Sequence, residues 1–227
     1  MEYKIIGGAF PMVMCTLRKG ETMQDETGAM SYMTEGIKME TSTGGGLLKG
    51  LGRALSGDTI FLNYFTAEED DAEVAFSSCY PGKIIPIELN GNNSIIGQKN
   101  AFLTATKDVK LEMHFRKKLG AGIFGGEGFI LQRFSGNGTL FLEIDGDVIE
   151  KTLAPGERLL VDQGHVAAMD DTVDFDIQRV KGVKNLLFGG EGLFFATVTG
   201  PGRVWLQTMP VSKLAEAIIP FIPTKSD

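Results

Sequence analysis

The chain has 227 residues, of which 43% are hydrophobic and 22% are charged. This length and apolar content allow one large domain or two small ones, and they exclude a disordered chain or a small disulfide-stapled scaffold. The formal net charge of -7 at pH 7 argues against a nucleic-acid partner, because phosphate binding requires a surface rich in Lys and Arg.

The residue types favour an all-β fold. The chain contains 30 glycines and 15 phenylalanines but only 8 prolines, which fits short strands joined by tight turns. No segment with helical periodicity separates the expected strands, and parallel crossovers normally require one. We therefore expect antiparallel strands in two or three packed sheets.

The chain repeats itself. The pentapeptide Phe-Gly-Gly-Glu-Gly begins at Phe124 and again at Phe188, 64 residues later, and that offset aligns other glycines without a gap. A weaker upstream copy aligns at an offset of 72, which shortens to 69 near Gly57. We predict one domain, 1–227, built from three repeats at 8–80, 81–144 and 145–208, with a tail at 209–227.

Each repeat is expected to be a succession of short strands bounded by turn residues. In the third repeat these strands are 148–153, 158–162, 166–169, 172–179, 193–199 and 203–208. The turns place Gly or Asn where a hairpin requires a positive φ, at Gly28, Gly82, Asn100, Gly146 and Gly164.

Only the tail is expected to be helical. Ser212 can cap a helix over Lys213–Ile219 that Pro220 stops, and Phe221 and Ile222 extend its apolar stripe. This helix either closes an open end of the β structure or docks on another subunit.

Few residues have the setting that catalysis or metal binding needs. His114 and His165 fall at non-equivalent positions of the repeats, so a cupin-like set of metal ligands is not indicated. The acidic run 68–73 occupies a hairpin position and is expected to be a solvated turn. We predict no catalytic residue, no metal ligand and no cofactor.

The cysteines are expected to be reduced core thiols. Neither Cys15 nor Cys79 has a neighbouring His that could activate it as a nucleophile. An alternative function, a cupin-like or other small-molecule-binding enzyme with an atypical site, would use His165 with Asp162, Asp170 and Asp171.

Three loops that combine Gly, large aliphatic side chains and Lys or Arg are the best candidate for a docking surface. Equivalent loops of three repeats should emerge on one rim, and exposed apolar patches mark association sites. Their side chains plug the core, form a subunit interface, or contact a membrane or another partner. The candidate residues are Leu47, Leu48, Leu51, Leu55, Leu119, Ile123, Phe124, Leu186, Leu187 and Phe188.

The repeats and the opening segment 8–13, Gly-Ala-Phe-Pro-Met-Val, resemble the altered-inheritance-of-mitochondria family. That family has a eukaryotic member at the mitochondrial inner membrane and bacterial cytosolic relatives of unassigned activity. The resemblance implies a β-sandwich of the double-stranded β-helix kind, similar to the tryptophan-RNA-binding attenuator protein, in oligomers that are expected to be trimers. It implies no catalytic residue, and the attenuator's RNA binding does not transfer, since fold is not function.

The sequence thus predicts a non-enzymatic, oligomeric β scaffold that docks a partner, a membrane surface or other subunits. The start of the chain shows no secretion signal, and no run of about 18 apolar residues occurs. We therefore expect a cytoplasmic protein.

Overall fold

The computed structural model describes the chain except residues 27, 43–61, 118–128, 180–193 and 223–227. The described part is almost entirely β, with one short C-terminal helix, so the predicted all-β class is confirmed. Every strand pair in the described part is antiparallel.

The strands follow one another along the chain with short connections in most places. The first part of the chain contains β1 (Glu2–Ile6), β2 (Met12–Leu17), β3 (Thr22–Glu26), β4 (Met30–Met33), β5 (Ile37–Ser42), β6 (Leu62–Ala67) and β7 (Ala72–Ser77). The middle contains β8 (Gly82–Asn90), β9 (Ile95–Gln98), the 3₁₀ turn η1 (Lys99–Ala101), β10 (Phe102–Thr106), β11 (Val109–Lys117) and β12 (Phe129–Asp145).

The last part of the chain begins with β13 (Val148–Leu153), β14 (Arg158–Asp162), the 3₁₀ turn η3 (Gln163–His165) and β15 (Val166–Asp170). It continues with β16 (Asp174–Arg179), β17 (Phe194–Thr199), β18 (Gly202–Gln207), the helix α2 (Val211–Ile218) and the 3₁₀ turn η4 (Ile219–Phe221). The strands of this part match the sequence-based bounds to within two residues. Whether the chain is one domain of three repeats stays a prediction.

Three sheets run along the molecule, and the long strand β12 joins two regions of the largest one. The first sheet has the order β1-β2-β7-β4, and the last has the order β14-β17-β16. In the 11-stranded sheet between them, the first half of β12 pairs with β11 and β9, and its second half pairs with β8 and β10. Within this sheet, β10 pairs with β3 from the first part of the chain, and β9 pairs with β15 from the last part. These two pairs bring strands of all three parts into one sheet.

The core of the described part contains three apolar clusters. The first contains Val13 and Phe76 from the first sheet, together with Phe65 and Phe141 from the large one. Because Phe141 comes from the middle of the chain, this cluster crosses a predicted repeat boundary. The other two clusters cross the second boundary in the same way, since both mix strands of the middle and last parts.

Some local predictions need correction. The helix begins at Val211 rather than Lys213, and Ser212 does not cap it: Pro210 is the N-cap residue, and the Val211 N–H donates to Asp145 Oδ2 at 2.8 Å. The helix also passes directly into η4, which contains Pro220.

The turn predictions are correct at Gly28 and Gly146, whose φ angles are positive, and wrong elsewhere. Asn100 and Gly164 lie in η1 and η3 without a positive φ. Gly82 also lacks a positive φ, and it is glycine because an added Cβ would collide with the backbone oxygen of Ile144.

Candidate functional site

All ten predicted docking residues lie outside the described residues: Leu47, Leu48, Leu51, Leu55, Leu119, Ile123, Phe124, Leu186, Leu187 and Phe188. The strands that flank these segments are described. Each segment connects two adjacent strands that pair with each other: β5 with β6, β11 with β12, and β16 with β17. Each segment therefore joins two strands that pair with each other, and the role of the three segments as a docking surface stays a prediction.

The residues of the alternative enzyme site each have a separate structural partner. Nδ1 of His165 lies 2.7 Å from the backbone oxygen of Gln207. Asp162 Oδ2 lies 3.1 Å from Lys213 Nζ, and Asp171 Oδ1 accepts a bond of 2.7 Å from Arg133. Within the described ranges, no group of three or more His, Cys, Asp or Glu side chains is placed to hold a metal ion.

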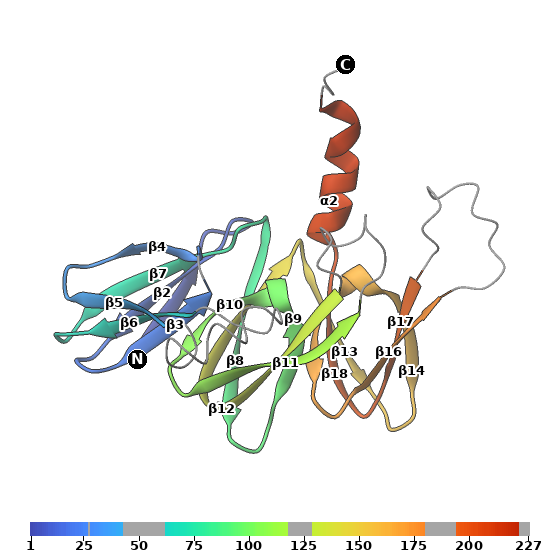
Figure 1. Cartoon of the computed structure of the whole chain (residues 1–227), viewed down its shortest axis with the longest axis horizontal. Coiled ribbons are helices and arrows are strands. Elements are labelled where there is room, and N and C mark those ends of the chain that lie inside the picture. Colours follow the sequence, from blue (N-terminus) through green and yellow to red (C-terminus); the bar gives the residue numbers. More distant parts are fainter. Residues whose placement is uncertain (27, 43–61, 118–128, 180–193, 223–227) are drawn as a thin grey trace, which may run out of the picture.

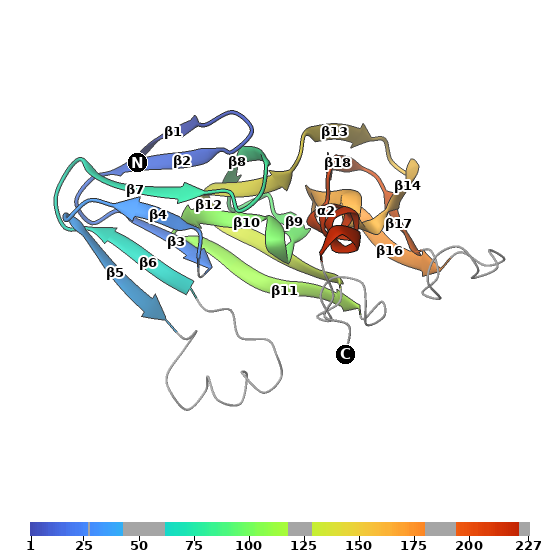
Figure 2. The ribbon, with the colours of Figure 1, turned by 90° about the horizontal axis from the view of Figure 1, so that it is seen from above.

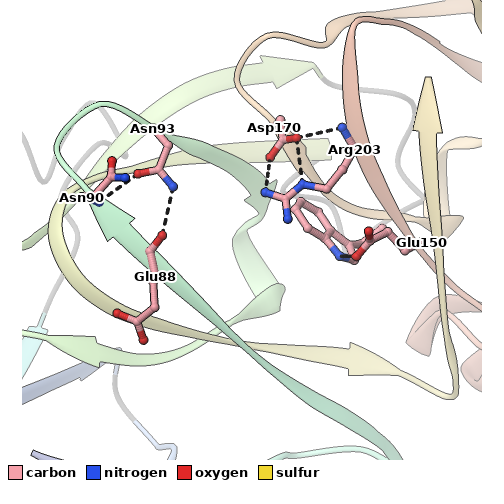
Figure 3. Close-up of polar contacts among 7 residues, drawn as sticks. Glu88, Asn90, Asn93, Glu150, Asp170 and Arg203 are labelled. Carbon is pink, nitrogen blue, oxygen red and sulfur yellow. Dashed lines mark hydrogen bonds and ion pairs between the residues drawn. The ribbon is translucent and has the colours of Figure 1, made fainter. Parts of the chain in front are cut away.

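Asp170 belongs to a polar network centred on Arg203 (Figure 3). Arg203 Nε and Nη2 both donate to the Asp170 carboxylate, at 3.1 and 2.9 Å, and the Arg203 backbone N–H donates to the same group at 2.8 Å. The guanidinium lies 4.7 Å from the ring centroid of Trp205, whose Nε1 donates to Glu150. These contacts join β13, β15 and β18, which indicates a structural role.

The second cluster in Figure 3 holds the turn between β8 and β9. Asn93 Nδ2 donates to the backbone oxygen of Glu88 at 2.9 Å, and Asn93 Oδ1 accepts from the Asn90 N–H at 2.8 Å. The carboxylate of Glu88 accepts from Thr139 on β12. This cluster also consists of mutual contacts that stabilise a turn.

A cavity of about 350 Å³ lies between β11 and the turn that leads into β16. Its lining includes His114, Arg133, Asp171, Asp174 and Phe175. The Arg133–Asp171 ion pair lies in this lining, so these two charges already neutralise each other. The cavity is large enough for a small polar molecule and is the described feature that best fits the alternative function.

The two cysteines differ. Cys15 is buried, and burial raises the pKa of its thiol to about 12, as expected for a core residue. Cys79 is exposed, so the prediction that it is a core thiol is wrong; it lies in the turn that precedes β8. Partial burial and the nearby Glu143 carboxylate raise the pKa of its thiol, which disfavours the reactive thiolate at neutral pH.

The acidic run 68–73 is a turn over Glu68 to Asp71, as predicted, but Glu73 lies in β7 and is only partly exposed. Residues Glu68 to Asp71 are exposed between β6 and β7, and Asp71 has a φ of 60°. Asp70 Oδ1 accepts a hydrogen bond from the Lys19 N–H at 2.9 Å. The run thus packs against a neighbouring turn.

Among the described residues, large exposed apolar side chains lie at sheet edges, in turns and at the C-terminus. Leu160 on β14 is 66% exposed, and Tyr32 and Met33 on β4 are 38% and 39% exposed. β4 and β14 are edge strands of the first and last sheets, and the two lie at opposite ends of the long axis (Figures 1 and 2). An edge strand presents unpaired backbone groups, so these edges can accept another strand.

The C-terminal segment is a further exposed apolar surface of the described part. Helix α2 has no buried residue among those described and projects away from the sheets (Figure 1). Exposed apolar side chains continue through η4, and Phe221 reaches 84% exposure. These residues are Ile218, Ile219, Phe221 and Ile222.

The sequence analysis did not identify Met33 and Leu160. A usable signal exists, because the repeat offsets align Met33 with Ala105 and Met169, and align Leu160 with Ile96. All three of these counterparts are buried. An apolar residue that is buried in one repeat and exposed in another marks a surface that a partner can cover.

No helix in the described ranges combines the length and the apolar character that a bilayer crossing requires.

Comparisons with known proteins agree with the resemblance seen in the sequence. An uncharacterised protein of Streptococcus pyogenes is 29% identical over 226 residues, which cover 96% of this chain and 89% of that protein. The crystal structure of a Streptococcus pyogenes protein superposes with a TM-score of 0.78 at 25% identity and covers 97% of this chain and 99% of the other. The family model described as Mitochondrial biogenesis AIM24 matches residues 3–209, and the chain therefore belongs to that family.

Proposed function

We propose that this protein is a non-enzymatic β scaffold that works as an oligomer of identical chains, with a trimer as the expected state. The observation that supports it is the pair of edge strands, β4 and β14, which carry exposed apolar side chains and each have one unpaired side at opposite ends of the described structure. Exposed flat edges promote association, and soluble proteins normally cover or blunt them. A scaffold built from such edges needs no catalytic group.

The exposed C-terminal segment, Ile218 to Ile222, supports the same proposal as a further contact between subunits. The Gly-rich loops of 43–61, 118–128 and 180–193 are proposed as the rim that plugs the core, joins subunits, or meets a partner or membrane. The negative net charge supports a protein without a nucleic-acid partner, and the two unpaired cysteines fit a reducing, cytoplasmic setting.

The molar mass of the full chain in solution tests the proposal. Light scattering after size exclusion, over a hundredfold range of protein concentration, should give a fixed multiple of 24.5 kDa. A protein that stays monomeric throughout that range would contradict the scaffold function. The chain with Leu48→Asp, Ile123→Asp and Leu187→Asp tests the loops, because unchanged mass and unchanged liposome binding would exclude their docking role.

A second candidate, a small-molecule-binding protein, is favoured by the cavity beside Arg133 and Asp171. Mass spectrometry of the denatured extract and metal analysis of the purified protein would detect a retained ligand. A stoichiometric small molecule that is lost in Arg133→Ala or His165→Ala would favour this function. A protein that carries none, and that binds none of a metabolite panel, would exclude it.

A further inference from the structure

Two strand junctions within the chain have the same geometry. At the first junction, β10 pairs with β3, with Ala105 opposite Gln24. At the second, β15 pairs with β9, with Met169 opposite Ile96. Met169 lies 64 residues after Ala105, and Ile96 lies 72 residues after Gln24, which are the sequence offsets between the repeats. The same register therefore joins the first part of the chain to the middle and the middle to the last.

A backbone hydrogen bond also recurs at both junctions. The Lys107 N–H donates to the Thr22 oxygen at 3.1 Å, and the Asp171 N–H donates to the Ser94 oxygen at 3.1 Å. These pairs are related by the same two offsets. Register in a sheet is strongly specified when one face is buried, because a one-residue slip turns each side chain to the other face.

Among the described residues, the first and last parts of the chain each contain one strand that corresponds to a junction strand but lacks its partner. The offsets align β4 with β10 and β15, and β14 with β9 and β3. Within the described part, however, β4 and β14 each have one strand neighbour, whereas all four counterparts have two. The side chains follow the same rule: Met169 and Ile96 are 0% and 2% exposed, but their counterparts Met33 and Leu160 are 39% and 66% exposed.

We propose that β14 of one molecule pairs antiparallel with β4 of a second copy, in the register of the internal junctions. The shared register places Leu160 opposite Met33 and Val161 opposite Tyr32. It also directs the Glu35 N–H of one copy to the Arg158 oxygen of the other. This inference rests on the proposed oligomeric function, because it names the surfaces through which the copies join.

The charges and residue types of these two edge strands support a second copy of the chain as their partner. β4 contains no charged residue and no proline, although exposed edges are usually protected by such residues. Glu35 follows β4 and Arg158 begins β14, so the proposed register brings opposite charges together across the contact. Because two different edges meet, the contact is head-to-tail and can extend around a closed ring.

The Leu160–Met33 contact can be tested by disulfide formation. Directly opposed residues of antiparallel strands have Cα atoms about 4.5–5.5 Å apart, within the range of a disulfide. In a Cys79→Ser background, Met33→Cys and Leu160→Cys chains should cross-link when mixed and not when kept separate. Leu159→Cys mixed with Met33→Cys is the matched control, because Leu159 points to the opposite face and should cross-link at least tenfold less.

The Glu35–Arg158 contact gives a second, non-covalent test. Arg158→Glu alone and Glu35→Arg alone should each raise the dissociation constant of the oligomer about tenfold or more, because like charges then oppose each other. The double variant restores opposite charges and should return to within about threefold of the original chain. Thermal unfolding of each diluted variant shows that the chain itself is still folded.

The outcomes separate this inference from the proposed function. A wild-type chain that is monomeric at all concentrations contradicts both. An oligomer that shows no Met33–Leu160 cross-link, or no rescue by the charge exchange, contradicts the strand pairing but leaves the scaffold function standing. Cross-linking of either single-cysteine chain with itself indicates a symmetric edge contact and also overturns the head-to-tail pairing.

Discussion

Arg203 holds the carboxylate of Asp170 through its backbone N–H and two side-chain nitrogens, all within 3.1 Å. This arrangement fastens β18 to the end of β15, next to the strand pair β15–β9. The hydrogen bonds that Arg203 donates to Asp170 also raise the pKa of the guanidinium, which stays charged at any working pH.

We expect Arg203→Ala to lower the free energy of unfolding by about 1–2 kcal/mol, since a bidentate pair is stronger than an ordinary surface pair but this one is partly exposed to solvent. Lys38→Ala is the control, because the Lys38–Glu40 pair is exposed to solvent and its loss should lower stability less than the loss of the Arg203–Asp170 pair. Urea unfolding measures both. Equal losses of unfolding free energy in the two variants would show that the Arg203–Asp170 contact stabilises the fold no more than an exposed ion pair does.

The stability of the chain should fall as the pH rises through the range in which Asp25 ionises. Asp25 is fully buried, and this burial raises its pKa to about 6, although the hydrogen bond from Asn63 opposes the shift. The folded state therefore holds its proton more tightly than the unfolded state does, where the pKa is about 3.9. The unfolding free energy should decrease by about 2–3 kcal/mol as the pH rises from about 4 to above 6.

Asp25→Asn removes the titration and should flatten this part of the pH profile. The difference in unfolding free energy between the variant and the original chain should therefore shift in favour of the variant between pH 4 and pH 7. Unfolding by urea at a series of pH values measures the two slopes. A pH profile with the same slope in both proteins would assign the effect to another group, such as Glu143, whose pKa burial also raises.

Phe141 is expected to be a major core contributor. It is fully buried in the first apolar cluster, and its ring meets the Tyr3 ring edge-on, with 4.9 Å between centroids. Phe141→Ala should lower the unfolding free energy by about 3–5 kcal/mol because it leaves a cavity. Phe10→Ala makes the same chemical change at a side chain that is 70% exposed and should cost less than about 0.5 kcal/mol. Thermal or urea unfolding compares them.

Two glycines with similar backbone angles should respond differently to alanine. Gly136 has a φ of +104°, and a Cβ there would collide with the backbone oxygen of Asp108. Gly156 has a φ of +78° with no atom within 4 Å of the position of a Cβ. Gly156→Ala should cost about 1 kcal/mol from backbone strain alone, and Gly136→Ala should cost at least 2 kcal/mol more. Similar losses in urea unfolding would exclude the steric contribution.

The sequence predicted the strands well because their signals are local. β13 and β14 begin and end at the predicted residues, since β-branched and apolar runs are bounded there by turn residues. The helix was located within two residues, but its N-terminal hydrogen bond was not predicted. That bond comes from Asp145, which lies 66 residues earlier in the chain. No local pattern at Ser212 could indicate it.

The candidate surface at β4 and β14 was not predicted from the sequence. The Gly-rich loops remain predictions, whereas Met33 and Leu160 became visible through their exposed fractions. The exposure of Cys79 was also not predicted. Cysteine is usually a buried residue type, but Cys79 lies in the turn before β8, where the described part of the chain does not cover it fully. Exposure depends on what packs over a residue, and that cannot be read from the residue's own neighbours in the chain.

The amino-acid sequence by itself determined the all-β class, the order and bounds of most strands, and the family resemblance, because each follows from residue type and spacing along the chain. Only the tertiary structure decided which strands meet. It placed Ala105 opposite Gln24 and Met169 opposite Ile96, and it left Met33 and Leu160 uncovered. The physical reason is that strand pairing forms through backbone groups common to all residues, so the choice of partner depends on which apolar faces can be buried together.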